Sequence, residues 1–274
     1  MAARLPMKGF RTVVRVMSGA TFQIAAPDRD VIHLRDIAHH LAQCNRYNGA
    51  CLWPYSVARH CIHVASVLPV ELRLAGLLHD APEAYLGDVV RPLKVLMDDY
   101  REIEAQYQEV IESIFGLERG LLSSSEVKYA DCRVMASEMA SDLLGWEDIL
   151  EYPLAPIDIV ETGWREDRLA YVLASCLLAL PAGAQAECLA SWQDDAVPLL
   201  LPRGISAVAS ELDSRDSVDI VDRALENALG CRLEERTAGE VRKELVTAVQ
   251  DLAEIFGTDR NCLPEESDES PRMQ

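Results

Sequence analysis

One imidazole and three carboxylates stand within ten residues of each other between His79 and Asp88. The segment reads His-Asp-Ala-Pro-Glu-Ala-Tyr-Leu-Gly-Asp and directly follows the apolar run from Leu72 to Leu78. Imidazole nitrogens and carboxylate oxygens are ligands of divalent transition metals. On a helix, the side chains of adjacent His79 and Asp80 would point about 100° apart. One ion could contact both only if it lay at the edge of the helix, and other segments would have to supply its remaining ligands. The segment therefore predicts part of a metal site.

His60 and Asp131 are the candidates for the other ligands. His60 stands at the start of one expected helix and His79 at the end of the next, and two antiparallel helices would bring them together. Asp131 comes from a later helix, where small neighbours would let it approach an ion in the core. Two imidazoles and two carboxylates suit Mn, Fe, Co, Ni or Zn, and the lack of a thiolate argues against a structural zinc site. Such an ion lowers the pKa of water towards about 7 and polarises a phosphoryl oxygen, as phosphate ester hydrolysis requires.

The elements expected to position these residues are mainly helices. Two β-rich runs, 12 to 17 and 21 to 24, flank Ser18-Gly19 and predict a small hairpin. Apolar residues at three- and four-residue spacing then predict helices over 34–47, 56–68, 71–79, 99–115, 126–144 and 165–180. The predicted fold class is therefore all-α, a helical bundle with a small N-terminal β-hairpin.

The composition changes after residue 180. We expect a core domain over 1–180, a connector over 181–216, a helical extension over 217–257 and a disordered acidic tail over 258–274. The second helix of the extension opens with Thr237 and Glu240, the spacing of a capping box. Two amphipathic helices need a partner face, so the extension either docks on the core or pairs with a second copy. A homo-oligomer, dimer or higher, is expected.

Composition and charge limit the classes of partner. The 274 residues include 45 acidic and 26 basic side chains, for a formal net charge of -19, which argues against binding a nucleic-acid duplex. A small phosphate-bearing ligand remains compatible, because a metal and a few local cations can override the global charge. No apolar run reaches the roughly 20 residues of a membrane span, and no secretory signal is recognisable, so we expect a cytoplasmic protein without a membrane partner. The eight cysteines form no Cys-x-x-Cys pair and are expected to be reduced.

The ordered set His60, His79-Asp80 and Asp131 resembles the metal motif of the HD-domain phosphohydrolases. The surrounding sequence, from about residue 12 to 180, is similar to the branch of bacterial 5'-deoxynucleotidases and phage deoxynucleoside triphosphohydrolases, among them dATP-depleting enzymes. Five segments carry the likeness: Asp36-Ile37-Ala38-His39, Arg46-Tyr47-Asn48-Gly49, Tyr55-Ser56-Val57-Ala58-Arg59-His60, the segment from Leu77 to Asp88, and Arg91-Pro92-Leu93-Lys94.

This resemblance implies that His60, His79, Asp80 and Asp131 ligate the metal. It further implies that Glu83 and Asp88 form an acid/base pair or bind a second ion such as Mg.

The same resemblance implies a set of substrate-binding residues. Arg46 and Lys94 look like phosphate clamps, although Arg46 could instead form a structural salt bridge and Lys94 could belong to a solvated helix start. Tyr47 or Trp53 would be the aromatic residue near the sugar. The commoner deoxynucleotidase pattern has Arg followed by Trp, so Tyr47 departs from it, and this puts deoxyribose selection in doubt.

For four other polar residues we expect structural roles. His63 and His39 are expected to pack in the core or beside the metal ligands and not to bind the ion themselves. Glu138 could pair with an arginine inside the bundle or lie near the site, and we favour the structural pairing. Cys61 is expected to be a core residue and not a nucleophile.

The implied function is hydrolysis of small nucleotides in the cytoplasm of a bacterium or a phage-infected host. A metal-activated water would attack the 5'-linked phosphorus of a deoxynucleoside mono- or triphosphate, releasing orthophosphate or tripolyphosphate, and both products remain open. One alternative is a hydrolase of a signalling nucleotide. The other is a non-catalytic metal-bound interaction module.

Overall fold

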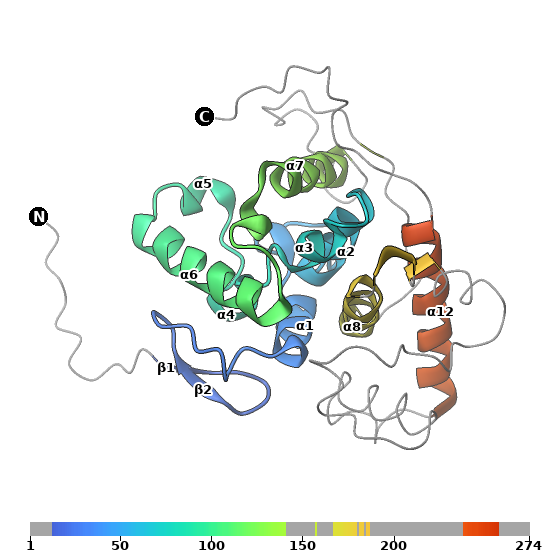
Figure 1. Ribbon diagram of the computed structural model, residues 1–274, viewed down its shortest axis with the longest axis horizontal. Coiled ribbons are helices and arrows are strands. Elements are labelled where there is room, and N and C mark those ends of the chain that lie inside the picture. The colour runs from blue at the N-terminus through green and yellow to red at the C-terminus, as the bar shows by residue number, and fades with distance from the viewer. Residues whose placement is uncertain are drawn as a thin grey trace, which may run out of the picture.

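Helices α2 and α3 form the centre of a helical bundle (Figure 1). A two-stranded antiparallel hairpin near the N-terminus of the chain lies beside α1. The computed structural model describes residues 13–140, 157, 167–179, 181–183, 185–186 and 238–257. The elements are β1 (Val13–Arg15), β2 (Thr21–Gln23), α1 (Leu34–Gln43), η1 (Arg46–Gly49), α2 (Val57–Ser66), α3 (Arg73–Leu78), α4 (Glu83–Leu86), α5 (Arg91–Lys94), α6 (Asp98–Phe115), η2 (Leu121–Ser123), α7 (Ser125–Ala140), α8 (Asp167–Leu178) and α12 (Ala238–Gly257). The predicted helical fold with a small hairpin is confirmed.

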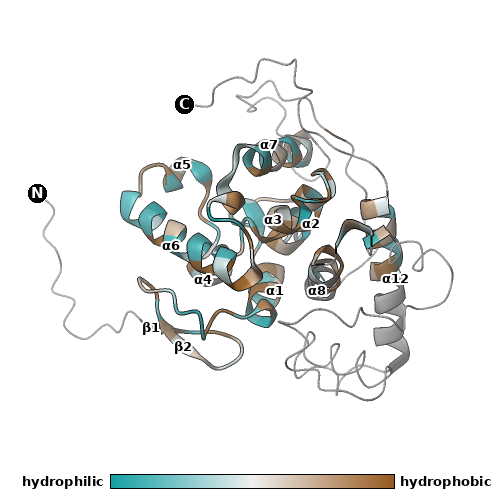
Figure 2. Ribbon diagram, in the orientation of Figure 1, coloured by the Kyte–Doolittle hydropathy of each residue, from teal (hydrophilic) through white to brown (hydrophobic). Residues whose placement is uncertain are grey.

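The central helices are covered on both sides. Helix α7 packs against α2 and α3 on one side, α8 packs against them on the other, and α12 lies outside α8 (Figure 1). The largest fully buried side chains on these helices include Ile62, Leu77, Tyr171 and Leu177. In Figure 2, α6 is mainly hydrophilic, whereas the described part of α8 is mainly hydrophobic. This difference agrees with the place of α8 between the central pair and α12.

The hairpin is fixed to α1 by polar contacts. Its turn uses Gly19 with φ +91, a left-handed conformation that glycine adopts without steric cost. The preceding Ser18 donates both its backbone N–H and its hydroxyl to the buried carboxylate of Asp36, at 2.8 Å each. The hairpin therefore has a fixed place beside α1.

Helices α2 and α3 approach each other closely at Gly76. A Cβ at this position would lie 2.5 Å from Leu68 Cδ1 and 3.1 Å from the backbone Cα of Ala65. We expect the substitution Gly76→Ala to lower the free energy of unfolding by about 1–3 kcal/mol, the usual cost of overpacking. Urea denaturation would measure it, with Gly183→Ala as the control, because an added Cβ there meets no atom within 4 Å. Equal stability of the two variants would contradict the prediction.

The second helix predicted in the extension is α12, and it docks on the core. It packs against α8 and α2, and its buried side chains include Leu252, Ile255 and Phe256. Arg73 donates to the backbone oxygen of Phe256 at 3.2 Å, and its guanidinium carbon lies 5.5 Å from the centre of the Phe256 ring. Four predicted features lie outside the described residues. They are most of the connector, the first helix of the extension, Thr237 and the acidic tail.

The helix predicted over 34–47 ends earlier, at Gln43. The chain then turns so that the Arg46 backbone N–H donates to Tyr55 O at 3.0 Å, a contact that a continuing helix would exclude. Tyr47 and Asn48 take left-handed φ angles of 56° and 53°. Such angles are uncommon for residues other than glycine and frequently occur near functional sites.

Two further observations concern the predictions from composition. Within the described ranges, no helix combines the length and the apolar character that a membrane crossing needs. The four cysteines that the structure describes are free thiols: Cys44, Cys51, Cys61 and Cys132.

Candidate metal centre

Four side chains from separate parts of the bundle bring their ligand atoms together. His60 comes from α2, His79 and Asp80 follow α3, and Asp131 comes from α7. His60 Nε2 lies 3.1 Å from Asp131 Oδ1 and 3.8 Å from Asp80 Oδ2. His79 Nε2 lies 3.1 Å from Asp80 Oδ2 and 3.9 Å from Asp131 Oδ1. The structure thus brings together all four residues that the sequence proposed as metal ligands.

Hydrogen bonds set both imidazoles in the orientation that a metal ligand needs. His79 Nδ1 lies 2.8 Å from the backbone oxygen of Gly76, to which it can only donate, so a proton sits on Nδ1 and, in the neutral ring, Nε2 is the nitrogen with the lone pair. His60 Nδ1 likewise faces the carboxylate of Glu138 at 2.7 Å. His79 Nε2 is buried and accepts no hydrogen bond from any described residue. A divalent cation would satisfy this nitrogen, so the donor set fits a metal ion.

The N-terminus of α2 is anchored to α8, which positions His60. Ser56 caps α2 by accepting from the backbone N–H of Arg59 at 3.1 Å, and its hydroxyl donates to Asp167 at 2.6 Å. Arg59 donates to the same carboxylate at 2.6 and 3.0 Å. At the end of α3, the hydroxyl of buried Tyr171 donates to Leu77 O at 2.8 Å, next to His79. The start of α2 and the end of α3 are therefore both held by α8.

The charges of the four ligands favour a cation. Burial alone would raise the pKa of Asp80, but His79 and then His60 and Arg46 hold it well below its ordinary value. The pKa of Asp131 is also lowered, against burial, by its hydrogen bond with His60. Burial would lower the pKa of His79, yet the carboxylate of Asp80 raises it well above its ordinary value. The two ionised carboxylates give the site the negative charge that favours a cation, and an ion would take the place of any proton on the imidazole nitrogens that face them.

Cys61 lies beside the same cluster. Its sulfur, His79 and Asp80 form a second group whose ligand atoms all lie within 4.8 Å of one another. Burial raises the pKa of the Cys61 thiol to about 11, so the thiol stays protonated near neutral pH. The expectation that Cys61 belongs to the core is confirmed by its complete burial.

Glu83 is a buried carboxylate near the four ligands. It is 6% exposed, and its Oε2 has no hydrogen-bond partner within the part of the chain that the structure describes. Burial, and then the negative charges of Asp80 and Asp88, raise its pKa well above the ordinary value. Lys94 Nζ lies 3.5 Å from Glu83 Oε1 and 2.6 Å from Glu104 Oε1. Glu83 can therefore hold or release a proton beside a cation.

Asp88 completes this group of acidic residues. Gly87, with φ +82, ends α4 and turns the chain just before Asp88. Burial raises the pKa of Asp88, the charge of Arg46 opposes the rise, and the charge of Asp80 adds to it. Asp88 is thus in the same electrostatic environment as the metal ligands.

Arg46 and Tyr47 both bind Glu138, for which the sequence favoured a structural pairing over a place near the site. Arg46 Nε donates to Glu138 Oε2 at 3.1 Å, the Tyr47 hydroxyl donates to the same oxygen, and Arg46 Nη1 lies 3.7 Å from Asp80 Oδ2. The expected pairing of Glu138 with an arginine is confirmed. Glu138 also contacts His60, and its spacing from Asp131 in the sequence could have indicated this second contact. Glu138 follows Asp131 by seven residues, nearly two helical turns, so both residues lie on one face of α7.

The electrostatics of Glu138 follow from its partners. Burial would raise its pKa, but the positive charges of Arg46 and then of His60 hold it far below the ordinary value. The other aromatic candidate, Trp53, is 49% exposed.

The remaining histidines of the region have structural contacts. His63 is buried and stacks on Tyr55, with ring centroids 6.5 Å apart and planes inclined by 8°. His40 Nδ1 donates to Ala84 O at 2.6 Å, and its Nε2 accepts from the Met17 backbone N–H at 3.1 Å. The ring of His39 packs edge-on against that of His40.

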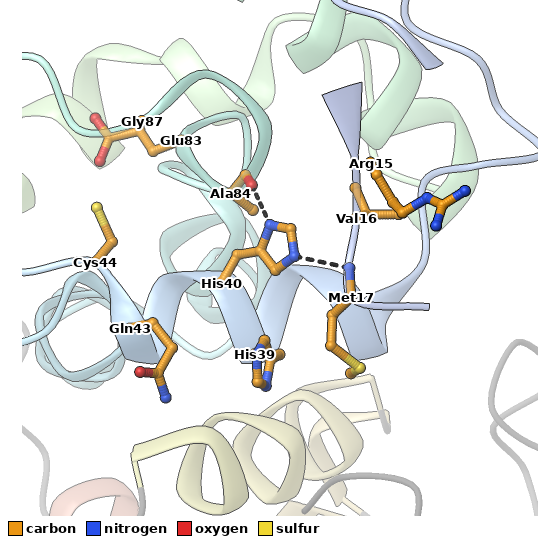
Figure 3. A pocket seen from close by; sticks show the side chains of 10 residues that line it. All are labelled: Arg15, Val16, Met17, His39, His40, Gln43, Cys44, Glu83, Ala84 and Gly87. Atoms are coloured by element: carbon orange, nitrogen blue, oxygen red, sulfur yellow. Dashed lines mark hydrogen bonds between the residues drawn. The ribbon is translucent and has the colours of Figure 1, made fainter. Parts of the chain in front are cut away.

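A cavity of about 660 Å³ lies between the hairpin, α1 and α4. Figure 3 shows Glu83 and Cys44 at one end, Arg15 at the other, and His40 between them. Its volume is within the usual range for small-molecule sites. Glu83 lines this cavity, whereas none of the four candidate ligands is among its lining residues.

Two proteins are similar to this chain. The uncharacterized protein YfdR of Escherichia coli K12 is 35% identical over 141 residues, which cover 52% of this chain and 77% of YfdR. The uncharacterized protein RCAP_rcc00048 of Rhodobacter capsulatus is 35% identical over 113 residues, covering 38% of this chain and 58% of that protein. No protein-family profile matches the chain.

Proposed function

The chain belongs to the family of Escherichia coli YfdR, and for this chain we propose the function of an HD-domain, metal-dependent phosphohydrolase of nucleotides. The observation that carries the proposal is the meeting of two imidazole nitrogens with two carboxylate oxygens that lie 3.1 to 3.9 Å from them, with a buried imidazole nitrogen that lacks a hydrogen bond from any described residue. The order of His60, His79-Asp80 and Asp131 along the chain supports membership of the HD-domain group.

His60, His79, Asp80 and Asp131 would hold the ion, and their donor set suits Mn, Co, Fe, Ni or Zn. When bound, such an ion acts as a Lewis acid that makes water more acidic and polarises a phosphoryl oxygen.

Nearby side chains supply the proton transfers and the phosphate contacts. In its protonated form, which the raised pKa favours, Glu83 would donate its proton to the 5' oxygen of the nucleoside as the phosphorus–oxygen bond breaks. Asp88 would orient the attacking water and accept its proton, or bind a second ion such as Mg. Lys94, whose Nζ also lies 2.6 Å from the carboxylate of Glu104, would bind phosphate oxygens together with the outer nitrogens of Arg46.

The cavity beside Glu83 is our candidate site for the nucleoside. Val16, Met17 and Ala84 offer apolar surface for a base, and Gln43 offers both a donor and an acceptor. Of the two aromatic candidates for the sugar, we favour Tyr47, because its hydroxyl is held at Glu138 next to the centre, whereas Trp53 is half exposed.

The proposed function predicts metal-dependent release of phosphate from nucleotides. The Mn- or Co-loaded protein would be incubated with a panel of ribo- and deoxynucleoside mono- and triphosphates, and the products separated by ion-exchange chromatography. Tripolyphosphate would identify a triphosphohydrolase, and orthophosphate from monophosphates a 5'-nucleotidase. EDTA should abolish either activity.

Inactivity on the whole panel, with metal binding intact, would reject the proposed nucleotide substrates. A panel of cyclic nucleotides and guanosine tetraphosphate would then test the signalling alternative. Inactivity on this second panel as well would favour the remaining alternative, a non-catalytic metal-bound interaction module.

A further inference from the structure

Glu138 is a buried carboxylate at the meeting point of three hydrogen-bond donors. The residue is 1% exposed and lies on α7. Its Oε1 is 2.7 Å from His60 Nδ1, and its Oε2 accepts from Arg46 Nε at 3.1 Å and from the Tyr47 hydroxyl. One side chain thus contacts a metal-ligand candidate and a phosphate-binding candidate at the same time.

The contact with His60 decides which nitrogen of the ring faces the ion. A carboxylate acceptor at Nδ1 keeps a proton there, so Nε2, which faces Asp80 and Asp131, is the nitrogen that would bind the ion. Outer-shell carboxylates of this kind orient the ligand and make it more basic. His79 has only a backbone carbonyl in the corresponding place, at Gly76. Of the two histidines, His60 therefore has the stronger outer-shell partner.

The contacts with Arg46 and Tyr47 fix the turn that follows α1. Tyr47 and Asn48 have left-handed φ angles in this turn, which cost energy and persist only where surrounding contacts hold them. Glu138 binds the two side chains that enter the turn and leaves Arg46 Nη1 directed at the ligand cluster, 3.7 Å from Asp80 Oδ2.

We propose that Glu138 is a positioning residue that sets the metal affinity through His60 and the substrate affinity through Arg46. The first part requires only that the four ligands bind an ion. The second part rests on the proposed function. Glu138 itself contacts neither the ion nor the substrate.

The test is the substitution Glu138→Gln, with Glu112→Gln as a matched control. Glutamine keeps the size of the side chain but loses the charge and turns an N–H group towards a ring nitrogen or towards Arg46 and Tyr47. Glu112 is also a buried glutamate, 2% exposed, but its oxygens accept from the backbone N–H groups of Gly120 and Leu122 at 2.8 and 3.0 Å. Both variants lose a buried charge, and only the first alters the outer shell of His60.

We expect Glu138→Gln to weaken Mn²⁺ binding by about 10–100-fold, measured by electron paramagnetic resonance, and to raise KM for the nucleotide. Glu112→Gln should bind Mn²⁺ as the unchanged protein does. A folded Glu138→Gln protein with unchanged Mn²⁺ affinity would overturn the first part, and an unchanged KM would overturn the second. A protein that binds Mn²⁺ without hydrolysing nucleotides would reject the proposed function and, with it, the second part, while the first part could still be tested.

A second measurement does not depend on the folding of any variant. Nitrogen-15 NMR of the histidine rings in the metal-free, unsubstituted protein should find His60 with Nδ1 protonated at neutral pH. A neutral His60 with its only proton on Nε2 would overturn the proposal even if Glu138→Gln failed to fold.

Discussion

Replacing Glu83 with alanine is expected to lower turnover at least about 100-fold and to leave Mn²⁺ affinity within about twofold. The expectation follows from the position of Glu83, buried near the four ligand residues but outside the set whose atoms converge. Removing its carboxylate takes away the proton donor for the leaving oxygen without removing a ligand. Initial rates and a Mn²⁺ titration on the same preparation would measure both quantities.

Glu104→Gln is the matched control for Glu83→Ala. Glu104 shares Lys94 with Glu83, since Lys94 Nζ lies 2.6 Å from Glu104 Oε1 and 3.5 Å from Glu83 Oε1. The control alters the environment of Lys94 and leaves the Glu83 carboxylate in place. Unchanged turnover in Glu83→Ala would eliminate the acid role. An equal loss in both variants would show that Lys94, and not Glu83, carries the effect.

Replacing His60 with glutamine should abolish turnover and weaken Mn²⁺ binding by more than the 10–100-fold that is usual for an outer-shell change. The imidazole supplies one of the four ligand atoms, and its loss leaves the buried carboxylate of Glu138 without one of its three donors. Isothermal titration with Mn²⁺ would give the affinity, and circular dichroism would confirm that the variant is folded.

His63→Gln on the same helix is the corresponding control. His63 is one turn further along α2, is equally buried and stacks on Tyr55. We expect this variant to lose stability and to keep its Mn²⁺ affinity. If His63→Gln weakened the affinity as strongly as His60→Gln, His60 would have no special role as a ligand.

The proximity of the candidate ligands could be predicted from the sequence because their positions have local signals. His60 and His79 lie at helix ends that face each other in an antiparallel pair, and their ring centroids are 5.3 Å apart in the structure. The helix predicted over 99–115 ends at Phe115, and Gly116 directly after it takes a left-handed conformation. Helix ends and residue types are local properties, so a single sequence can predict them.

The parts that escaped prediction depend on contacts between distant segments. The left-handed turn at Tyr47 is held by Glu138, which lies 91 residues later in the chain, and no local sequence pattern predicts that pairing. The cavity exists because Ser18 and Met17 fix the hairpin to α1 through Asp36 and His40. Helix periodicity does not carry such information, because it reports which face of an element is apolar and not which element covers it.

Gly76 performs two tasks at once. Its missing side chain allows α2 and α3 to approach, and its carbonyl oxygen holds the ring of His79. The spacing of the central helices and the orientation of a metal ligand are therefore coupled through a single residue. By thermodynamic linkage, an ion that binds only the closely packed helices must in turn hold them together, so the metal would act as a cross-link of the folded state.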